Sequence, residues 1–119
     1  MRYVDGFVLA VPEKNLKVYR SIAQKAGKIW KEHGALEYVE GVGDDLEVKF
    51  GVSFLKMVKP KAGETVLFSF IIYKSRAHRD KVNGKVMSDP RMNKMMEKGP
   101  MPFDLKRMAY GGFKTLVDL

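Results

Sequence analysis

The sequence predicts an α+β protein of the ferredoxin-like class (βαββαβ), in which helices cover one face of an antiparallel sheet. Two observations carry this prediction. The expected elements run strand, helix, strand, insertion, strand, helix, strand, and two of the strands are apolar on both faces. The length of 119 residues suits one domain with its own core and leaves no room for a second. We therefore expect residues 1–119 to form a single domain.

The first half of the chain contains three expected elements. Tyr3 to Val11 alternates two apolar sets, which predicts a strand that is buried on both faces and ends at Pro12. From Glu13 to His33, apolar residues recur every three or four positions, which predicts an amphipathic helix stopped by Gly34. Ala35 to Val42 alternates with one more polar face, which is typical of an edge strand.

The middle of the chain is less regular. Gly43 to Gly63 places apolar residues in a strand-like order but interrupts them with glycine, charge and proline. We predict a long excursion here, with an irregular strand near Val48 to Met57. Glu64 to Tyr73 is again apolar on both faces, which predicts a second central strand.

Two more elements complete the pattern. Ser75 is placed to cap a helix that runs to Met87, and its inward-facing residues are expected to be Ala77, His78, Val82 and Val86. Lys106 to Val117 is expected to return as the last strand. Its Gly111-Gly112 pair predicts a bulge or a close approach by another backbone or a ligand.

The segment from Met87 to Met108 contains six methionines and two arginines. Asp89 followed by Pro90 indicates the start of a short helix, because an aspartate caps free amides and proline fits the first helical position. Three methionines then fall at i, i+3 and i+4 on one face: Met92, Met95 and Met96. Core packing is the favoured interpretation of this stripe, and an adaptable pocket wall is the alternative.

The composition excludes several classes of function. The chain contains no cysteine, which rules out disulfides, thiolate metal sites and cysteine nucleophiles. Its two histidines have no partner at metal-ligand spacing, and no glycine motif for nucleotide phosphates occurs. The start does not read as a signal peptide, and no apolar run approaches the roughly 18 residues of a membrane span. We expect a cytoplasmic protein without metal, cofactor or membrane contact.

The net charge of +8 would favour nucleic-acid binding only if the basic residues formed one patch. The lysines are instead spread along the chain with acidic residues between them. The densest group, Lys56 to Lys61, lies in a connection containing proline and glycine, which is typical of a solvated loop. We therefore expect no nucleic-acid partner.

Helices on one side only would leave the other sheet face bare. Because Tyr3 to Val11 and Glu64 to Tyr73 are apolar on both sides, a monomer would expose more than the roughly few hundred Å² of contiguous apolar surface that soluble monomers carry. A second copy related by a twofold axis is the simplest cover. The sequence therefore predicts a homodimer.

Several motifs taken together resemble the DUF1428 family. They are YVDGFVLAVP at the start, GALEYVE after the first helix, the acidic pair Asp44-Asp45, FSF in the third strand, Arg79-Asp80, MSDPRM, MPFD and the closing KRMAYGGF. The resemblance covers nearly the whole chain and implies a dimeric α/β barrel, in which two ferredoxin-like subunits pack sheet to sheet. It implies no activity, since this family has no assigned function.

Two positions depart from the family pattern. Family members usually follow the acidic pair with a proline-glycine turn and a threonine-rich strand, whereas this chain has DDLEVKFGVSF. The residue after MPFD is usually glycine, and here it is Leu105. Any role that the family assigns to these two turns is therefore not carried over to this chain.

The wider dimeric α/β-barrel group shares a cleft between sheet and helices, apolar with a few polar groups, as small-molecule sites generally are. Three carboxylates, Asp80, Asp89 and Asp104, could serve as a general base if they are buried, and Asp89 and Asp104 are the candidate catalytic residues. The candidate substrate-binding residues are Tyr3, Asp5, Phe68, Phe70, His78, Arg79, Met92, Met101, Phe103 and Arg107. The structural alternative is that Arg79-Asp80, Asp89-Arg91 and Asp104-Arg107 are ion pairs that hold the last crossover in place.

Two classes of function remain open. The first is a cofactor-independent enzyme or ligand-binding dimer for a small apolar or carbonyl-bearing molecule. In it, Asp89 or Asp104 would accept a proton and Arg107 would hold an anionic group. The second is a non-catalytic, stress-related dimeric module that binds another protein. A ligand found in the cleft would favour the first class.

Overall fold

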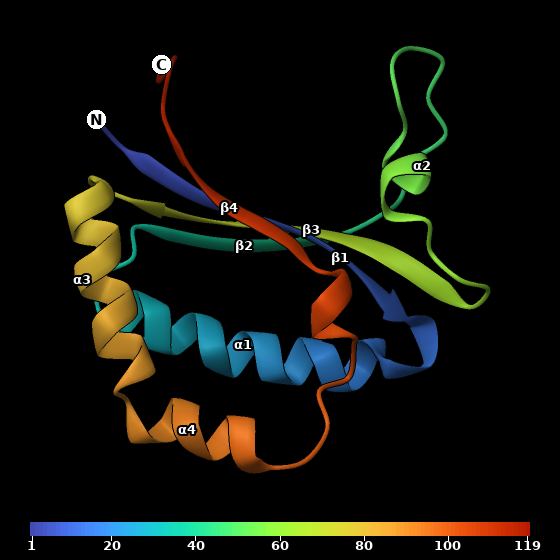
Figure 1. Cartoon of the computed structure of the whole chain (residues 1–119). Helices are drawn as coiled ribbons and strands as arrows, with labels where there is room; N and C mark the ends of the chain where they lie inside the picture. Colours follow the sequence, from blue (N-terminus) through green and yellow to red (C-terminus); the bar gives the residue numbers. More distant parts are fainter.

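The computed structural model describes residues 1–119, and its centre is a four-stranded antiparallel sheet (Figure 1). The strands are β1 (Tyr3–Pro12), β2 (Glu37–Val42), β3 (Glu64–Tyr73) and β4 (Ala109–Lys114). Their order in the sheet is β2-β3-β1-β4. This is the ferredoxin-like order, so the predicted fold class is confirmed, with the two strands that are apolar on both faces at the centre and β2 at an edge.

Three helices form a layer beneath the sheet in Figure 1. They are α1 (Leu16–Glu32), α3 (Arg76–Met87) and α4 (Pro90–Glu97). A 3-10 turn, η1 (Glu13–Asn15), leads from β1 into α1, and η2 (Leu105–Arg107) leads into β4. The short helix α2 (Phe54–Val58) lies on the opposite side of the sheet, within an arm that projects away from the helices.

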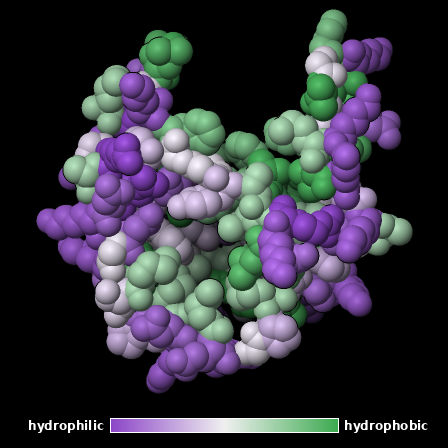
Figure 2. Space-filling view, in the orientation of Figure 1, coloured by the Kyte–Doolittle hydropathy of each residue, from purple (hydrophilic) through white to green (hydrophobic).

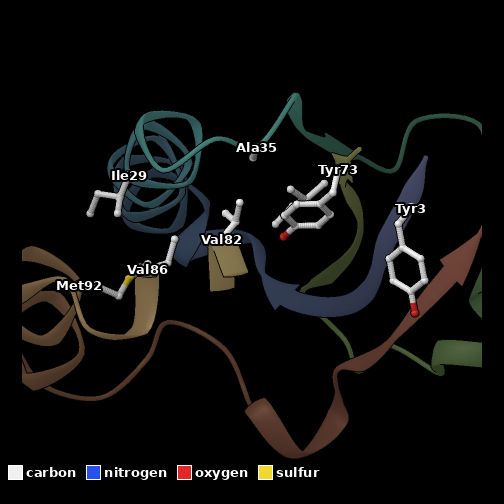
Figure 3. Packing of buried hydrophobic residues seen from close by; sticks show 8 residues of the cluster. Tyr3, Ile29, Ala35, Tyr73, Val82, Val86 and Met92 are labelled. Atoms are coloured by element: carbon white, nitrogen blue, oxygen red, sulfur yellow. The ribbon is translucent and has the colours of Figure 1, made fainter. Parts of the chain in front are cut away.

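Alternation along the central strands separates two faces. Leu9 pairs with Leu67, and Tyr3 pairs with Tyr73, and all four side chains are buried on the helix side. The main core cluster joins this face to the helices through Ile29, Val82, Val86 and Met92. Figure 3 shows Val82 and Val86 between Ile29 and Met92 on one side and the ring of Tyr73 on the other.

The other sheet face carries apolar side chains and no helix layer. Its members come from all four strands and include Val4, Val8, Val39, Phe68, Phe70, Ile72 and Phe113. We call this the open face. Phe113 is 63% exposed and Phe68 is 47% exposed, whereas Ala10 and Val66 are buried where α2 contacts β1 and β3. Figure 2 shows apolar residues in green along this face and on the two segments that project beside it, the arm with α2 and the ends of the chain.

The predicted irregular strand near Val48 to Met57 is wrong. Residues 43–52 form no strand or helix, and Phe54–Val58 is helical. The reason is local: the Ser53 side chain accepts a hydrogen bond from the backbone N–H of Lys56, at 3.2 Å, which caps a helix. Lys59, at φ 53°, then ends that helix in the left-handed conformation.

Smaller differences concern α3 and β4. Ala77 is exposed rather than inward-facing, while Val82 and Val86 are buried as predicted. The last strand is shorter than expected, because η2 occupies its first residues. No bulge interrupts β4, since its register against β1 is continuous. The close approach at Gly112 is made by the hydroxyl of Tyr3, which lies where a side chain at position 112 would have to go.

Candidate ligand-binding site

A cavity of about 810 Å³ lies between α1 and the edge strand β2. We call it the α1–β2 cavity. Alternation in β2 points every second side chain toward α1, and the helical repeat of α1 returns a second set of side chains toward the sheet. The lining residues are Leu16, Tyr19, Arg20, Ala23, Gln24, Gly27, Lys28, Lys31, Glu32, Tyr38, Glu40, Gly41, Val42 and Leu67.

Three polar side chains from two elements meet at the cavity wall. Tyr38 and Glu40 lie on the same face of β2, and the Tyr38 hydroxyl donates to Glu40 Oε2 at 2.6 Å. The Tyr19 hydroxyl, from α1, donates to the other oxygen, Glu40 Oε1. One carboxylate thus joins the helix to the strand. A carboxylate has about four acceptor positions, so Glu40 retains acceptor capacity beyond these two hydrogen bonds.

Both tyrosines are fixed as hydrogen-bond donors. Burial raises the pKa of Tyr19 and of Tyr38, and the adjacent Glu40 carboxylate raises both further. Burial disfavours the phenolate, and a neighbouring negative charge does the same. The two hydroxyls therefore stay protonated at neutral pH and hold the carboxylate in one orientation.

Gly27 allows the ring of Tyr38 to lie against α1. A Cβ atom at position 27 would lie 2.7 Å from Tyr38 Cδ1, closer than ordinary carbon contacts allow. Glycine inside a helix costs about 1 kcal/mol relative to alanine, so it needs a compensating contact. Here that contact is the ring of Tyr38, which forms part of the cavity wall.

The mouth of the cavity is rich in cationic side chains from α1. Arg20, Gln24 and Lys28 follow each other at four-residue intervals, so they lie along one side of the helix. Lys31 Nζ donates to the Leu36 carbonyl at 2.6 Å. Arg20 and Lys28 take part in none of the side-chain hydrogen bonds or ion pairs of this structure.

The acidic groups near this mouth are already engaged. Glu32 Oε2 accepts from Arg91 Nη2 at 2.6 Å, and Glu40 is bonded to the two tyrosines. Hydrogen bonding to Arg91 lowers the pKa of Glu32, so this carboxylate stays ionised. The cavity therefore offers a ligand two cations without an acidic partner at its mouth, Arg20 and Lys28, and one carboxylate with free acceptor positions at its wall, Glu40.

Three of the predicted substrate-binding residues, Tyr3, Asp5 and Arg79, lie together outside the lining of the α1–β2 cavity. Asp5, which is 1% exposed, accepts from Arg79 Nη1 at 2.8 Å, and the guanidinium lies 4.9 Å from the centre of the Tyr3 ring. Burial raises the pKa of Asp5, against the opposing charge of Arg79. Arg79 Nε also donates to Asp80 at 2.7 Å, so the predicted Arg79–Asp80 pair is present.

Asp89 caps α4 and forms an ion pair. Its oxygens accept from the Arg91 backbone N–H at 2.9 Å, from the Arg91 guanidinium at 2.9 and 3.1 Å, and lie 2.8 Å from His33 Nε2. Hydrogen bonds from Arg91 and His33 hold the pKa of Asp89 far below its usual value. An aspartate held this way is a weak proton acceptor.

Asp104 and Arg107 do not pair with each other. Asp104 caps η2 by accepting from the Lys106 backbone N–H at 3.0 Å. Arg107 instead binds both oxygens of Glu64 at 2.8 and 2.9 Å, which ties η2 to the start of β3. The predicted Asp104–Arg107 ion pair is therefore replaced by a bidentate pair between two elements far apart in sequence.

The other predicted residues are scattered. Phe68 and Phe70 face away from the helices, because they occupy the open-face positions of β3, so they do not line a cleft beneath the sheet. Met92 belongs to the core, and Phe103 packs edge-on against Tyr19 with 5.6 Å between ring centres. Met101 is half-buried. His78 Nδ1 accepts from the Lys74 backbone N–H at 3.0 Å, and burial and nearby lysines lower the pKa of His78.

Nowhere in the structure do three or more histidine or acidic side chains gather into a possible metal site. None of the helices has both the length and the apolar character needed to cross a membrane.

The sequence profile of DUF1428, a family of proteins of unknown function, matches residues 2–105. The chain belongs to the DUF1428 family. Its relatives include the uncharacterised protein YbaA of Escherichia coli strain K12, which is 48% identical over 118 residues, or 99% of each chain. YbaA of Shigella flexneri is similar to the same extent. The family resemblance predicted from the sequence is thus confirmed.

Two solved structures share the fold of this DUF1428 member. One is a dimeric ferredoxin-like protein from an uncultured marine organism, with a TM-score of 0.61, 11% identity and complete coverage of both chains. The other is a variant of SnoaB, a cofactor-independent oxygenase from Streptomyces nogalater. It has a TM-score of 0.56 and 10% identity, and the match covers 99% of this chain and 96% of SnoaB. Identities this low support the fold and carry no chemistry.

The lining of the α1–β2 cavity was missed by the sequence reasoning on this DUF1428 chain. One signal was available: Gly27 interrupts an otherwise good helix pattern, and a glycine there often marks the close approach of another group. Tyr38 and Glu40 also share one face of β2. Their pairing with Tyr19 depends on the tertiary arrangement and has no signature in the spacing of the residues.

Proposed function

We propose that this protein binds a small organic molecule in the α1–β2 cavity. The observation that carries the proposal is the cavity itself, whose volume of about 810 Å³ lies within the roughly 300–1,000 Å³ of typical ligand sites. Its wall combines apolar residues such as Leu16 and Leu67 with one fixed polar cluster. That combination is what small-molecule sites use for affinity and orientation.

The geometry supports binding more strongly than it supports catalysis. The two carboxylates expected to act as bases, Asp89 and Asp104, cap helices and lie outside the cavity lining. Glu40 is the carboxylate that faces the cavity, and its hydrogen bonds to two tyrosines suit a residue that orients a ligand. SnoaB shows that this fold accommodates cofactor-independent chemistry, but fold likeness alone does not transfer an activity.

Backbone amide NMR with 2-naphthol, a small neutral aromatic probe, tests the proposal. We expect shift changes at Ala23, Gly27 and Gly41, and we expect Ala23→Trp to abolish them by filling the cavity. Val18→Trp, on an exposed position of the same helix, is the matched control and should leave the changes intact. Changes confined to the open face, around Phe68 and Phe113, would contradict the proposal.

We also propose that two copies pack open face to open face, as in a dimeric α/β barrel. The support is that the open face is built from apolar side chains on all four strands, and its two charged residues, Glu37 and Glu64, are each the first residue of a strand. An uncovered face of this kind is rare in soluble monomers. The similar marine protein is described as dimeric, which agrees with the proposal.

The arm and the C-terminal end of the chain would enlarge such an interface. From a strand spacing of about 4.8 Å and a rise of about 3.3 Å per residue, the open face has a flat area on the order of 500 Å². Stable interfaces bury about 800 Å² per partner. Exposed apolar residues of the arm and the chain end supply further area: Val48, Phe50, Val52, Leu116 and Val117. Light scattering should give twice the 13.5 kDa mass of the chain, and a 13.5 kDa species at micromolar concentration would contradict the dimer.

A further inference from the structure

We infer that the ligand of the α1–β2 cavity is an organic anion with an apolar ring-bearing body and a hydrogen-bond donor, such as a hydroxyl, opposite its anionic group. This inference rests on the proposed function, since it specifies which molecules the cavity takes. It follows from the different polar groups at the two sides of the cavity. The mouth offers cations, and the wall offers an acceptor.

The anionic end follows from the charges at the mouth. Arg20 and Lys28 lie on the same side of α1 and form no ion pair, while the neighbouring Glu32 is paired at 2.6 Å with Arg91, a guanidinium that it shares with Asp89. An anion placed here gains two attractive contacts and meets no free carboxylate. A guanidinium also matches the planar geometry of a carboxylate, which it can bind through two parallel hydrogen bonds.

The donor end follows from Glu40. Each of its two oxygens accepts a hydrogen bond from one tyrosine hydroxyl, and each retains a further acceptor position. Because both hydroxyl protons are directed at Glu40, the cluster presents mainly acceptors to the cavity. A ligand that lacked a donor would leave the carboxylate poorly solvated when it displaced water, and this lowers affinity.

The apolar body follows from what lies between the two ends. Leu16, Ala23, Val42 and Leu67 line the cavity together with the ring of Tyr38. Ring systems fit such a wall well, because their flat faces stack against tyrosine and their rigidity limits the entropy lost on binding. The volume leaves room for two or more fused rings.

Three probes with one naphthalene body separate these contributions by calorimetry at low salt. They are 6-hydroxy-2-naphthoate, which has both groups, 2-naphthoate, which lacks the hydroxyl, and 2-naphthol, which lacks the carboxylate. We expect 6-hydroxy-2-naphthoate to bind tightest. Its affinity should exceed that of 2-naphthol by about tenfold and that of 2-naphthoate by about fivefold, as for single charge-assisted hydrogen bonds.

Matched variants locate the two ends. The double variant Arg20→Gln, Lys28→Gln should lower the affinity for 6-hydroxy-2-naphthoate and for 2-naphthoate by about tenfold. It should leave the affinity for 2-naphthol unchanged. Lys17→Gln with Lys25→Gln, an equal change of charge on exposed residues of the same helix outside the cavity, should change affinities by less than about twofold. Glu40→Gln should reduce the factor by which 6-hydroxy-2-naphthoate binds more tightly than 2-naphthoate. Tyr19→Phe should preserve that factor, because it frees one oxygen of Glu40.

The outcomes distinguish this inference from the proposed function. Binding of 2-naphthol as tightly as the two acids, with cavity amides shifted, would overturn the anion inference and leave ligand binding standing. An equal loss of affinity in the Lys17/Lys25 control would also overturn it, since the anion would then respond only to net charge. Failure of all three probes to shift any cavity amide would overturn both.

Discussion

Gly27 and Gly84 both lie inside helices, where glycine costs about 1 kcal/mol relative to alanine, but their surroundings differ. A Cβ at position 84 would meet nothing within 4 Å, whereas one at position 27 would overlap the ring of Tyr38. The same chemical change therefore tests two opposite environments. It separates the intrinsic preference of a helix from the packing of the cavity wall.

We predict that Gly84→Ala raises the free energy of unfolding by about 1 kcal/mol, the gain in helix propensity. Gly27→Ala should lower it by about 1–2 kcal/mol, because the overlap with Tyr38 outweighs that gain. Urea denaturation of both variants measures the difference. Equal stabilisation by the two alanines would show that Tyr38 moves aside at no cost.

The pKa of Asp89 predicts a specific dependence of stability on pH. Because its pKa is lowered in the folded state, Asp89 stabilises the fold above the unfolded-state pKa of about 4, and this contribution is lost as the pH falls further. Asp89→Asn keeps a capping side chain but removes the charge that faces Arg91 and His33. Its melting temperature should therefore lie below that of the wild type at pH 7, with the gap closing toward pH 2.

Asp104→Asn is the control for this titration, since Asp104 is exposed and caps only the three-residue η2. Its melting temperature should follow the wild type across the pH range. A gap for Asp89→Asn that stays constant from pH 7 to pH 2 would show that the charge of Asp89 does not contribute.

At the scale of elements, the sequence predicted what depends on local pattern. The alternation of Tyr3 to Val11 and Glu64 to Tyr73 predicted the two central strands, because a strand buried on both faces needs apolar residues at every position. The Ser75 and Asp89 caps predicted the starts of α3 and α4, because capping depends on a side chain and the backbone a few residues away.

The arm and the candidate site were not predictable in the same way. Apolar alternation over Val48 to Phe54 resembles a strand, but a strand requires a neighbouring strand to pair with, and residues 48–54 pair with none. The cluster of Tyr19, Tyr38 and Glu40 joins a helix to a strand through side-chain bonds. Such contacts follow from the packing angle of α1, which no spacing in the sequence encodes.

The arm provides a prediction at this scale. Phe54 packs edge-on against Phe68, with 6.1 Å between ring centres, whereas Phe50 is 91% exposed in the same arm. Phe54→Ala should lower the free energy of unfolding by about 1 kcal/mol through the lost aromatic contact and the exposure of the sheet beneath. Phe50→Ala should cost less than about half of that in dilute protein. A larger effect of Phe50→Ala on urea denaturation would contradict this assignment.

At the scale of the whole molecule, the proposed dimer depends on the open face. Phe113→Lys places a charge within the proposed apolar contact, where a charge without a partner is costly, so light scattering should show the mass of a monomer. Val18→Lys is the matched control: Val18 is 56% exposed on α1, on the side of the sheet away from the proposed interface. It should leave the mass unchanged. Dimers in both variants would place the contact elsewhere.

The proposed dimer would also change what a melting temperature means for this protein. When a second copy covers an apolar surface of the folded chain, unfolding includes dissociation, and the midpoint becomes a function of protein concentration. Each tenfold dilution then removes roughly 1.4 kcal/mol per mole of dimer. A cell that makes little of the protein would hold it as a less stable monomer with its sheet exposed, so abundance itself would set how long the fold persists.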